Sequence, residues 1–302
     1  MARKAMCMVV GCGCVGTHKI DIDRRGGRGG FLCDFHFDNN DWYGTGNSAV
    51  VGTEKKNGIK IGREFELSFA DDKARHEFTA MKAVPTNDGS LHDEQSRGRE
   101  VEFVFPTECG LNKVSKDAVS IEKLMNSGAI ESNETCGTHL HVSTEETRNN
   151  IDRDHGMEAV RRFYNSLFVP VTEVMSRNAE ATEALFGRFF TGYAPAIDMT
   201  TRQEAGHNST RYAWVNCTNS NRIEYRLVKF RNARQYMAVV KACVEMTKAI
   251  DANFLKHFND AKIDATRYEN MTDYRKHKAA VTAEKLVKIY KKACAEVGYT
   301  VE

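Results

Sequence analysis

Several features that mark particular protein classes are scarce or missing in this chain. Its 302 residues include only four prolines and no low-complexity tract, which argues against long disordered linkers. No apolar run is long enough to span a bilayer, and the start, MARKAMCMVVGCGC, lacks the sustained apolar region and cleavage site of a signal peptide. The net charge is only +2, so bulk electrostatics makes no case for nucleic acid or anionic membranes as partners. We therefore expect a cytoplasmic protein with no membrane partner.

A disulfide framework is also missing, although the chain has nine cysteines. The count is odd and no secretion signal accompanies it, so scattered cysteines are expected to be buried thiols. Four of the nine fall in the first 33 residues, where LCDFH has the Cys-x₂-His spacing of half a zinc site. The predicted zinc ligands, with Cys14 or His18 as substitutes, are Cys7, Cys12, Cys33 and His36. The alternative is a set of free thiols, because the first half of the pattern departs from common zinc spacing.

The cysteine-rich segment forms the smaller of two predicted domains, residues 1–55, which are rich in Gly, Cys and Asp. A structural zinc ion would supply the folding energy that its small apolar content cannot. Arg24, Arg25 and Arg28 could help such a module dock on a protein or nucleic acid, which nothing else in the sequence supports.

The larger predicted domain, residues 57–302, alternates between strand-like and helix-like patterns. Strand-like segments are 59–69, 100–106, 134–143, 211–217 and 221–230. Helical spacing of apolar residues occurs over 115–127, 156–177, 234–255 and 282–297. Pro170 is expected to kink or divide the second of these helices. The pattern predicts an α+β fold, in which helices cover one apolar face of a mainly antiparallel sheet.

The other face of this predicted sheet collects ionisable residues. Side chains at i and i+2 of a strand share a face. Four strands contribute such sets: Glu64 with Glu66, Glu100 with Glu102, His139 with His141, and Arg222 with Glu224 and Arg226. For any one set, an ordinary solvated face is the alternative, but such faces are usually rich in Thr, Ser and Lys. Four sets on neighbouring strands favour a functional site.

The residue types indicate what such a site would bind. Clustered carboxylates repel one another unless a cation lies between them, and glutamates with a histidine suit Mg²⁺ or Mn²⁺. Arginines cannot bind a metal, but their forked hydrogen bonds fit phosphate. Carboxylates and arginines on one face therefore predict a metal–nucleotide site. The chain has no Walker A loop and no kinase signature, so this would be a different ATP-binding architecture.

Five motifs occur in an order that resembles the amidoligase family. They are GREFELSF, DGSL, EVEFVFP, CGTHLHVS and RYAWVN…NRIEYRL, and the resemblance covers roughly residues 57–260. That family is similar to glutamine synthetase and glutamate–cysteine ligase, and such sequences occur in phages and bacteria. The resemblance implies a glutamine-synthetase-like catalytic sheet and the ATP-dependent joining of a carboxylate to an amine through an acyl phosphate.

The resemblance also implies metal ligands. Glu64 and Glu66 resemble the Glu-x-Glu ligands of the first strand, and Glu102 resembles the glutamate of the following strand. His139 resembles the histidine that touches both metal and nucleotide phosphate, and Glu224 resembles the last metal ligand. All five are expected to lie in one metal-sized pocket with Mg²⁺ or Mn²⁺.

The remaining site residues are assigned to the nucleotide and the substrate. Arg226 and Arg211 would face phosphate or the acyl phosphate, and Arg222 is a further candidate for the nucleotide. His141 either orients substrate or hydrogen-bonds a neighbour, and we count it with Arg211 and Arg226 among the catalytic candidates. Asp88 of DGSL recurs in the family, but a turn-forming role is equally consistent with it.

Two other functions fit parts of the pattern. A metal-dependent hydrolase could use His139 and His141, or a glycosidase could use paired glutamates. A non-enzymatic binding protein could carry the zinc module on a scaffold whose acidic and histidine positions face solvent. The sequence leaves open the carboxylate and amine, which could be small molecules or peptide-like, and the oligomeric state.

Overall fold

The computed structural model describes eleven stretches of the chain. They are residues 18–20, 30–32, 58–86, 100–108, 110–133, 136–144, 157–192, 194–197, 213–216, 222–258 and 273–302. The chain divides into two compact units. Unit 1 comprises Met1–Glu54, Gly62–Glu108 and Lys123–Cys136, and unit 2 comprises Lys55–Ile61, Cys109–Glu122 and Gly137–Glu302.

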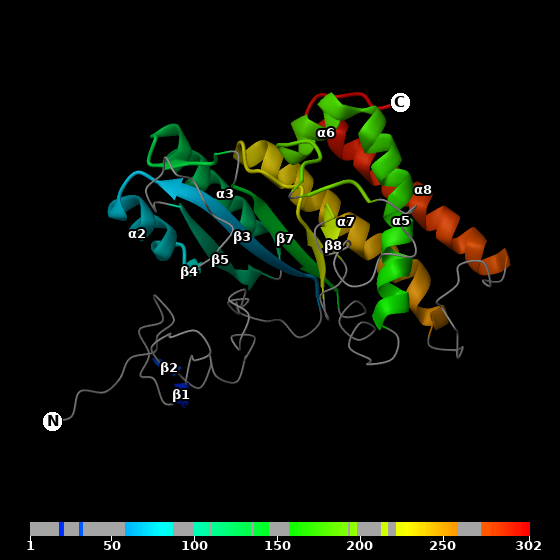
Figure 1. The fold of residues 1–302 in the computed structure, drawn as a ribbon, viewed down its shortest axis with the longest axis horizontal. Helices are drawn as coiled ribbons and strands as arrows, with labels where there is room; N and C mark the ends of the chain where they lie inside the picture. Colours follow the sequence, from blue (N-terminus) through cyan, green and yellow to red (C-terminus); the bar gives the residue numbers. More distant parts are fainter. Residues whose placement is uncertain are drawn as a thin grey trace. The chain divides into compact units, whose positions relative to one another are not determined.

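Unit 1 is built on two long strands, β3 (Lys60–Phe69) and β5 (Glu100–Glu108). The strand order is β4-β5-β3, where β4 (Val84–Thr86) pairs antiparallel with β5. A short strand, β6 (Ile130–Glu131), pairs antiparallel with the end of β3. Helix α2 (Asp72–Ala80) follows β3 along the chain (Figure 1). Both long strands were predicted from the alternation of apolar and polar residues, and that prediction is confirmed.

Phenylalanines form the core of unit 1. Phe65 and Phe69 of β3 lie on the same side of the strand, and their rings meet Phe105 and Phe103 of β5, each at 5.2 Å between centroids. Phe78 of α2 lies 5.2 Å from Phe69 and closes the cluster. Aromatic rings in these edge-to-face or tilted arrangements bury much apolar area. Because side chains alternate along a strand, the even-numbered residues of β3 lie on the face opposite the phenylalanine cluster.

In the described residues of unit 2, three strands and four helices lie wholly within the unit. The strands β7 (Thr138–Ser143), β9 (Ile223–Tyr225) and β8 (Val215–Asn216) pair antiparallel in that order. The helices are α5 (Met157–Arg177), α6 (Ala179–Phe186), α7 (Ala233–Phe258) and α8 (Asp273–Glu296). Helix α8 packs against α5, α6 and α7, and Figure 1 shows α7 and α8 side by side. Helix α3 (Leu111–Asn126) includes residues assigned to both units.

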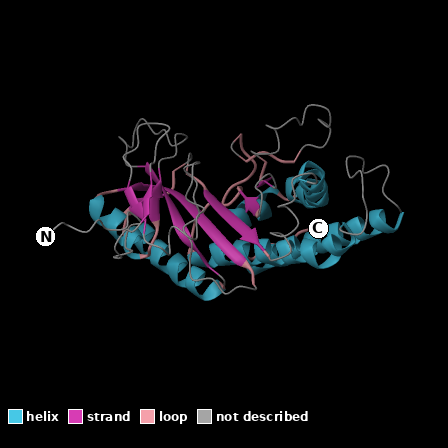
Figure 2. Ribbon diagram, turned by 90° about the horizontal axis from the view of Figure 1, so that it is seen from below, coloured by secondary structure: helices cyan, strands magenta, loops and turns pink. Residues whose placement is uncertain are grey.

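Helices cover one face of the strands of unit 2, as Figure 2 shows. The Tyr225 side chain of β9 reaches α7, where its hydroxyl donates to the Cys243 carbonyl at 3.2 Å and lies 3.0 Å from the Thr247 hydroxyl. Trp214, next to β8, is fully buried, and its indole N–H donates to the Thr172 hydroxyl of α5 at 2.9 Å. Helices together with mostly antiparallel strand pairing confirm the predicted α+β class.

The predicted helices occur near their predicted positions, with some differences. Pro170 lies inside α5 and does not divide it. Helix α8 begins at Asp273, ahead of the predicted start at 282, and α6 was not predicted.

The strand predicted over 221–230 is too long, because only Ile223–Tyr225 form β9. The backbone groups of residues after Tyr225 form hydrogen bonds with several different segments. The Lys229 amide donates to the Phe186 carbonyl at 2.6 Å, and the Val228 carbonyl accepts from Thr138 at 2.9 Å. Of the strand predicted over 211–217, the described residues Val215 and Asn216 form β8.

Little of the predicted zinc module is described. Its described part is an antiparallel pair of β1 (His18–Ile20) and β2 (Gly30–Leu32). Cys7, Cys12, Cys14, Cys33 and His36 lie outside the described residues, so the zinc site and the domain boundary at 55 stay predictions.

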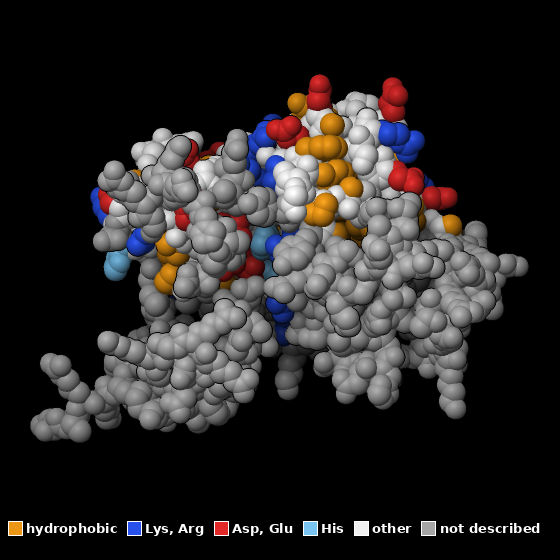
Figure 3. Space-filling view, viewed as in Figure 1, with side chains coloured by type: hydrophobic (Ala, Val, Ile, Leu, Met, Phe, Trp, Pro, Cys, Tyr) orange, Lys and Arg blue, Asp and Glu red, His pale blue; other side chains and the backbone are white. Residues whose placement is uncertain are grey.

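No helix in the described part of the chain is both long and apolar enough to cross a membrane. The described side chains on the face in Figure 3 include acidic and basic groups interspersed with each other. This mixture agrees with a net charge of only +2.

Candidate functional site

Three glutamates of β3 and β5 are buried in unit 1. Glu64 and Glu66 occupy the face of β3 opposite the phenylalanine cluster, and they are 3% and 7% exposed. Glu102 of β5 is 1% exposed. A carboxylate oxygen of Glu66 lies within 4.8 Å of one of Glu102. Two carboxylates this close and this buried repel each other unless a cation or a proton lies with them. These two carboxylates of unit 1 are close enough together to share a cation.

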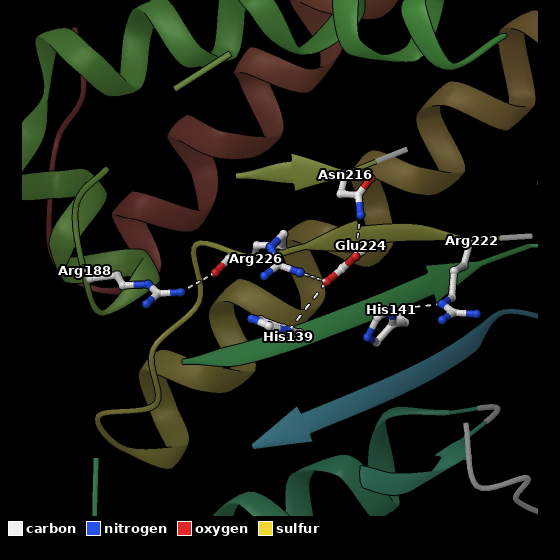
Figure 4. Close-up of polar contacts among 7 residues, drawn as sticks. All are labelled: His139, His141, Arg188, Asn216, Arg222, Glu224 and Arg226. Carbon is white, nitrogen blue, oxygen red and sulfur yellow. Dashed lines mark hydrogen bonds and ion pairs between the residues drawn. The ribbon is translucent and has the colours of Figure 1, made fainter. Parts of the chain in front are cut away.

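A second set of ionisable residues lies in unit 2, on β7 and β9. The two strands pair with His141 opposite Glu224, and both side chains are buried. His139, two residues earlier on β7, has its Nδ1 3.6 Å from Oε1 of Glu224 (Figure 4). Two atoms bound to one Mg²⁺ at about 2.1 Å are between about 3 and 4 Å apart. The His139–Glu224 separation therefore suits two ligands of one small cation.

Glu224 accepts hydrogen bonds on both of its oxygens. Arg226 donates from Nη1 to Oε1 at 2.5 Å, and Asn216 of β8 donates from Nδ2 to Oε2 at 2.7 Å. Asn216 is buried and lies opposite Glu224 in the β8–β9 register. The two donors hold the carboxylate in one orientation, in which Oε1 is the oxygen near His139.

His141 faces a different partner from His139. Arg222 donates from Nε to Nδ1 of His141 at 3.0 Å, as Figure 4 shows. An arginine has only donors, so Nδ1 must accept and the imidazole proton lies on Nε2. Of the two predicted roles for His141, the structure therefore shows the hydrogen bond to a neighbour. It also shows that the Nε–H group of Arg222 is hydrogen-bonded to His141.

Arg226 is held at its backbone as well as at its side chain. Its amide donates to the Trp214 carbonyl at 2.8 Å, and its carbonyl accepts from Nη2 of Arg188 at 2.5 Å. Arg188 also donates from Nε to the Leu227 carbonyl at 3.2 Å. The Arg226 side chain is 18% exposed, more than that of Glu224 at 6%. A fixed and partly exposed guanidinium beside a buried carboxylate suits an anionic ligand such as phosphate.

The predicted residues thus group within each unit. In unit 1 the structure brings Glu66 and Glu102 together, and Glu64 shares a strand face with Glu66. In unit 2 it groups His139, Glu224 and Arg226, and it pairs His141 with Arg222. The glutamates and histidines of these groups are buried, unlike the side chains of an ordinary solvated face, whereas Glu100, predicted to share a strand face with Glu102, is partly exposed. Arg211 and Asp88 lie outside the described residues.

Two residues of the network were missed at the sequence level. Asn216 is the last residue of the RYAWVN motif. Aligning this motif antiparallel to NRIEYRL, with Asn216 opposite Glu224, would have identified it as a cross-strand partner. Arg188 lies far from β9 in the sequence, and no local signal marks its bonds to the carbonyls of residues 226 and 227.

The donor set of each unit fits a hard divalent cation. Carboxylate oxygens suit Mg²⁺ and Mn²⁺, and an imidazole among them is tolerated better by Mn²⁺. The sulfur atoms that would favour a softer metal are not among these groups in the described residues, where Cys136, Cys243 and Cys294 are buried outside them. No protein-family model and no curated protein sequence matches this chain.

Proposed function

We propose that this protein is an ATP-dependent carboxylate–amine ligase of the amidoligase type. The observation that carries the proposal is the convergence on Oε1 of Glu224, where a guanidinium N–H and an imidazole nitrogen lie at 2.5 Å and 3.6 Å. A ligand for metal and a donor for phosphate beside one buried carboxylate is the combination that metal–nucleotide chemistry needs. The buried pair of Glu66 and Glu102 adds to it.

The metal ligands in this proposal are Glu64, Glu66, Glu102, His139 and Glu224. When bound, Mg²⁺ or Mn²⁺ would neutralise charge on the phosphate oxygens of ATP. The glutamates hold their oxygens on rigid strands, and His139 offers Nδ1. A glutamine-synthetase-like arrangement of the strands, a structural zinc ion in the N-terminal segment and a phage or bacterial cytoplasmic setting belong to the same proposal.

The chemistry proceeds in two displacements. An oxygen of the substrate carboxylate attacks the γ-phosphorus of ATP, the bond to the bridging oxygen breaks, and ADP leaves with an acyl phosphate remaining. The amine nitrogen then attacks the acyl carbon, phosphate leaves with the bonding pair, and the nitrogen gives up a proton to form the amide. Arg226 and Arg211 donate hydrogen bonds from their N–H groups to the oxygens of the phosphoryl group that is transferred. His141 donates from Nε2 to an oxygen of the substrate or the acyl phosphate.

The test is ADP release by the purified full chain with Mg²⁺, ATP and pools of carboxylates and amines, with condensation products read by mass spectrometry. Glu64→Gln keeps the shape of the ligand but removes its charge, and we expect it to lower turnover by about 10²-fold or more. Glu245→Gln is the matched control, since Glu245 is an exposed residue of α7 that pairs with Lys248.

Three outcomes are informative. ADP release that needs an amine and falls in Glu64→Gln supports the ligase. Turnover without any nucleotide favours a metal-dependent hydrolase. If the protein binds no Mg-ATP, or if Glu64→Gln behaves like Glu245→Gln, the proposal is wrong.

A further inference from the structure

Arg226 and a cation at the proposed site would share one carboxylate oxygen. Oε1 of Glu224 accepts a hydrogen bond from Nη1 of Arg226 at 2.5 Å and lies 3.6 Å from Nδ1 of His139. A cation bound to Oε1 at about 2.1 Å would therefore lie within about 5 Å of Nη1, whichever lone pair of the oxygen it used. Two positive groups this close repel each other. The guanidinium therefore opposes the binding of a bare cation at this oxygen.

The backbone of Arg226 is anchored on both sides, so movement away from Glu224 is left to its side chain. The Arg226 amide donates to the Trp214 carbonyl at 2.8 Å, and its carbonyl accepts from Nη2 of Arg188 at 2.5 Å. The Arg226 side chain is 18% exposed, against 6% for Glu224, and charges beside a buried carboxylate are screened less than charges on an open surface. The same partial exposure lets an anion from solvent reach the guanidinium.

A phosphate group reverses the effect of Arg226 on the cation. Phosphate oxygens accept forked hydrogen bonds from a guanidinium, and they also bind hard divalent cations. A phosphate bound to both would attract the guanidinium and the cation at once and so offset their repulsion. The arginine that opposes a bare cation therefore favours a cation that binds together with phosphate.

We propose that Arg226 selects the form in which the site binds its cation: it disfavours the bare divalent cation and favours the cation–phosphate complex. The inference rests on the proposed function in one respect, namely that Glu224 binds a divalent cation. It goes further in giving Arg226 a role in binding, before any phosphoryl transfer, with opposite effects on two ligands. Because binding free energies are linked, the cation and the nucleotide raise each other's affinity, and Arg226 contributes to that coupling.

The experiment measures two affinities of the purified full chain, without carboxylate or amine. Electron paramagnetic resonance counts free Mn²⁺ and gives the affinity for the bare cation. Equilibrium dialysis gives the affinity for the non-hydrolysable analogue β,γ-imido-ATP at saturating Mn²⁺. Arg226→Gln keeps an N–H donor but removes the charge, whereas Arg226→Lys keeps the charge. Arg177→Gln is the matched control, because Arg177 is an exposed residue of α5 that donates from Nε to the Glu173 carbonyl at 3.3 Å. Circular dichroism establishes that each variant is folded.

In Arg226→Gln we expect the affinity for bare Mn²⁺ to rise and the affinity for the analogue to fall, each on the order of tenfold. Arg226→Lys should keep the affinity for bare Mn²⁺ within about threefold of the parent, and Arg177→Gln should keep both affinities within that range. If Arg226→Gln does not fold, Arg226→Met is measured in the same way, with the same two opposite shifts expected.

The two proposals fail in different ways. If removing the charge of Arg226 shifts both affinities in the same direction, or shifts neither, this inference is wrong and the proposed function stands. If the parent and the Arg226 variants bind neither Mn²⁺ nor the analogue, both are wrong.

Discussion

At the residue scale, two histidines that are equivalent in the sequence pattern differ in the chemistry open to them. Nδ1 of His139 lies 3.6 Å from a carboxylate oxygen, a separation that suits a shared cation. Nδ1 of His141 accepts a hydrogen bond from Arg222 at 3.0 Å, so the same nitrogen is not available for a metal. Second partners of this kind set which nitrogen of an imidazole carries the proton. Arg222 is therefore a positioning residue for His141.

Nitrogen-15 NMR of the histidine side chains tests this assignment. The parent protein should show His141 protonated at Nε2 and unprotonated at Nδ1. Replacing Arg222 by Met removes the donor, so the Nδ1–H form should gain population, whereas Arg222→Lys should largely retain the parent signature. Arg177→Met, at an exposed position of α5, serves as the control. An unchanged tautomer in Arg222→Met would show that other groups set it.

At the element scale, the segment that follows β9 is held by the end of α6. Gly187 ends α6 with φ at +85°, and its position is so close to the Lys229 backbone that an added Cβ would lie 2.0 Å from the carbonyl oxygen. Arg231 donates from Nε to the Gly187 carbonyl at 2.8 Å, and Arg188 binds the carbonyl of Arg226. This junction keeps Arg226 at the end of β9, so the conformation of Gly187 affects a site residue that lies far from it in the sequence.

Gly187→Ala should destabilise the protein by at least about 2 kcal/mol, because the methyl group would strain both the left-handed backbone and the contact with Lys229. The free energy of unfolding in urea measures this. Gly192→Ala is the control, as Gly192 has no atom within 4 Å of an added Cβ, and its change should stay within about 0.5 kcal/mol. Equal effects of the two substitutions would contradict the close-packed junction.

At the scale of the whole molecule, the helices of unit 2 bury ionisable groups that affect global stability. Burial raises the pKa of the Cys294 thiol from 9.0 to about 11, although a hydrogen bond with Tyr290 opposes the shift. Burial likewise raises the pKa of Tyr290 and of Cys243 above their ordinary values. In each case the folded state retains a proton that the unfolded state releases at lower pH.

The free energy of unfolding should therefore fall as pH rises from about 9 to about 11. Below pH 9 the Cys294 thiol is protonated in both states, so its contribution is fully present, and it is lost as pH passes through the folded pKa. Chemical denaturation at a series of pH values measures this slope. Cys294→Ala should show a shallower decline, with the remainder due to groups such as Tyr290 and Cys243. A slope identical to that of the parent would show that Cys294 is not part of this linkage.

The sequence by itself determined the strands β3, β5 and β7, the approximate helices, and which side chains share a strand face. Local periodicity carries this information, since the pleat alone places Glu64 beside Glu66 and His139 beside His141 on one side. It also identified buried thiols such as Cys294 correctly, because cysteines outside a disulfide or zinc pattern are usually buried.

Only the tertiary structure decided which residues complete the network. The Asn216–Glu224 contact depends on strand register, and the contacts of Arg222 with His141 and of Arg188 with the Arg226 carbonyl join segments about 40 to 80 residues apart. The shortening of β9 has the same origin, because the backbone beyond Tyr225 divides its hydrogen bonds among Trp214, the end of α6 and the first residue of β7. Periodicity reports which face a side chain occupies, but its partner is set by how distant segments pack.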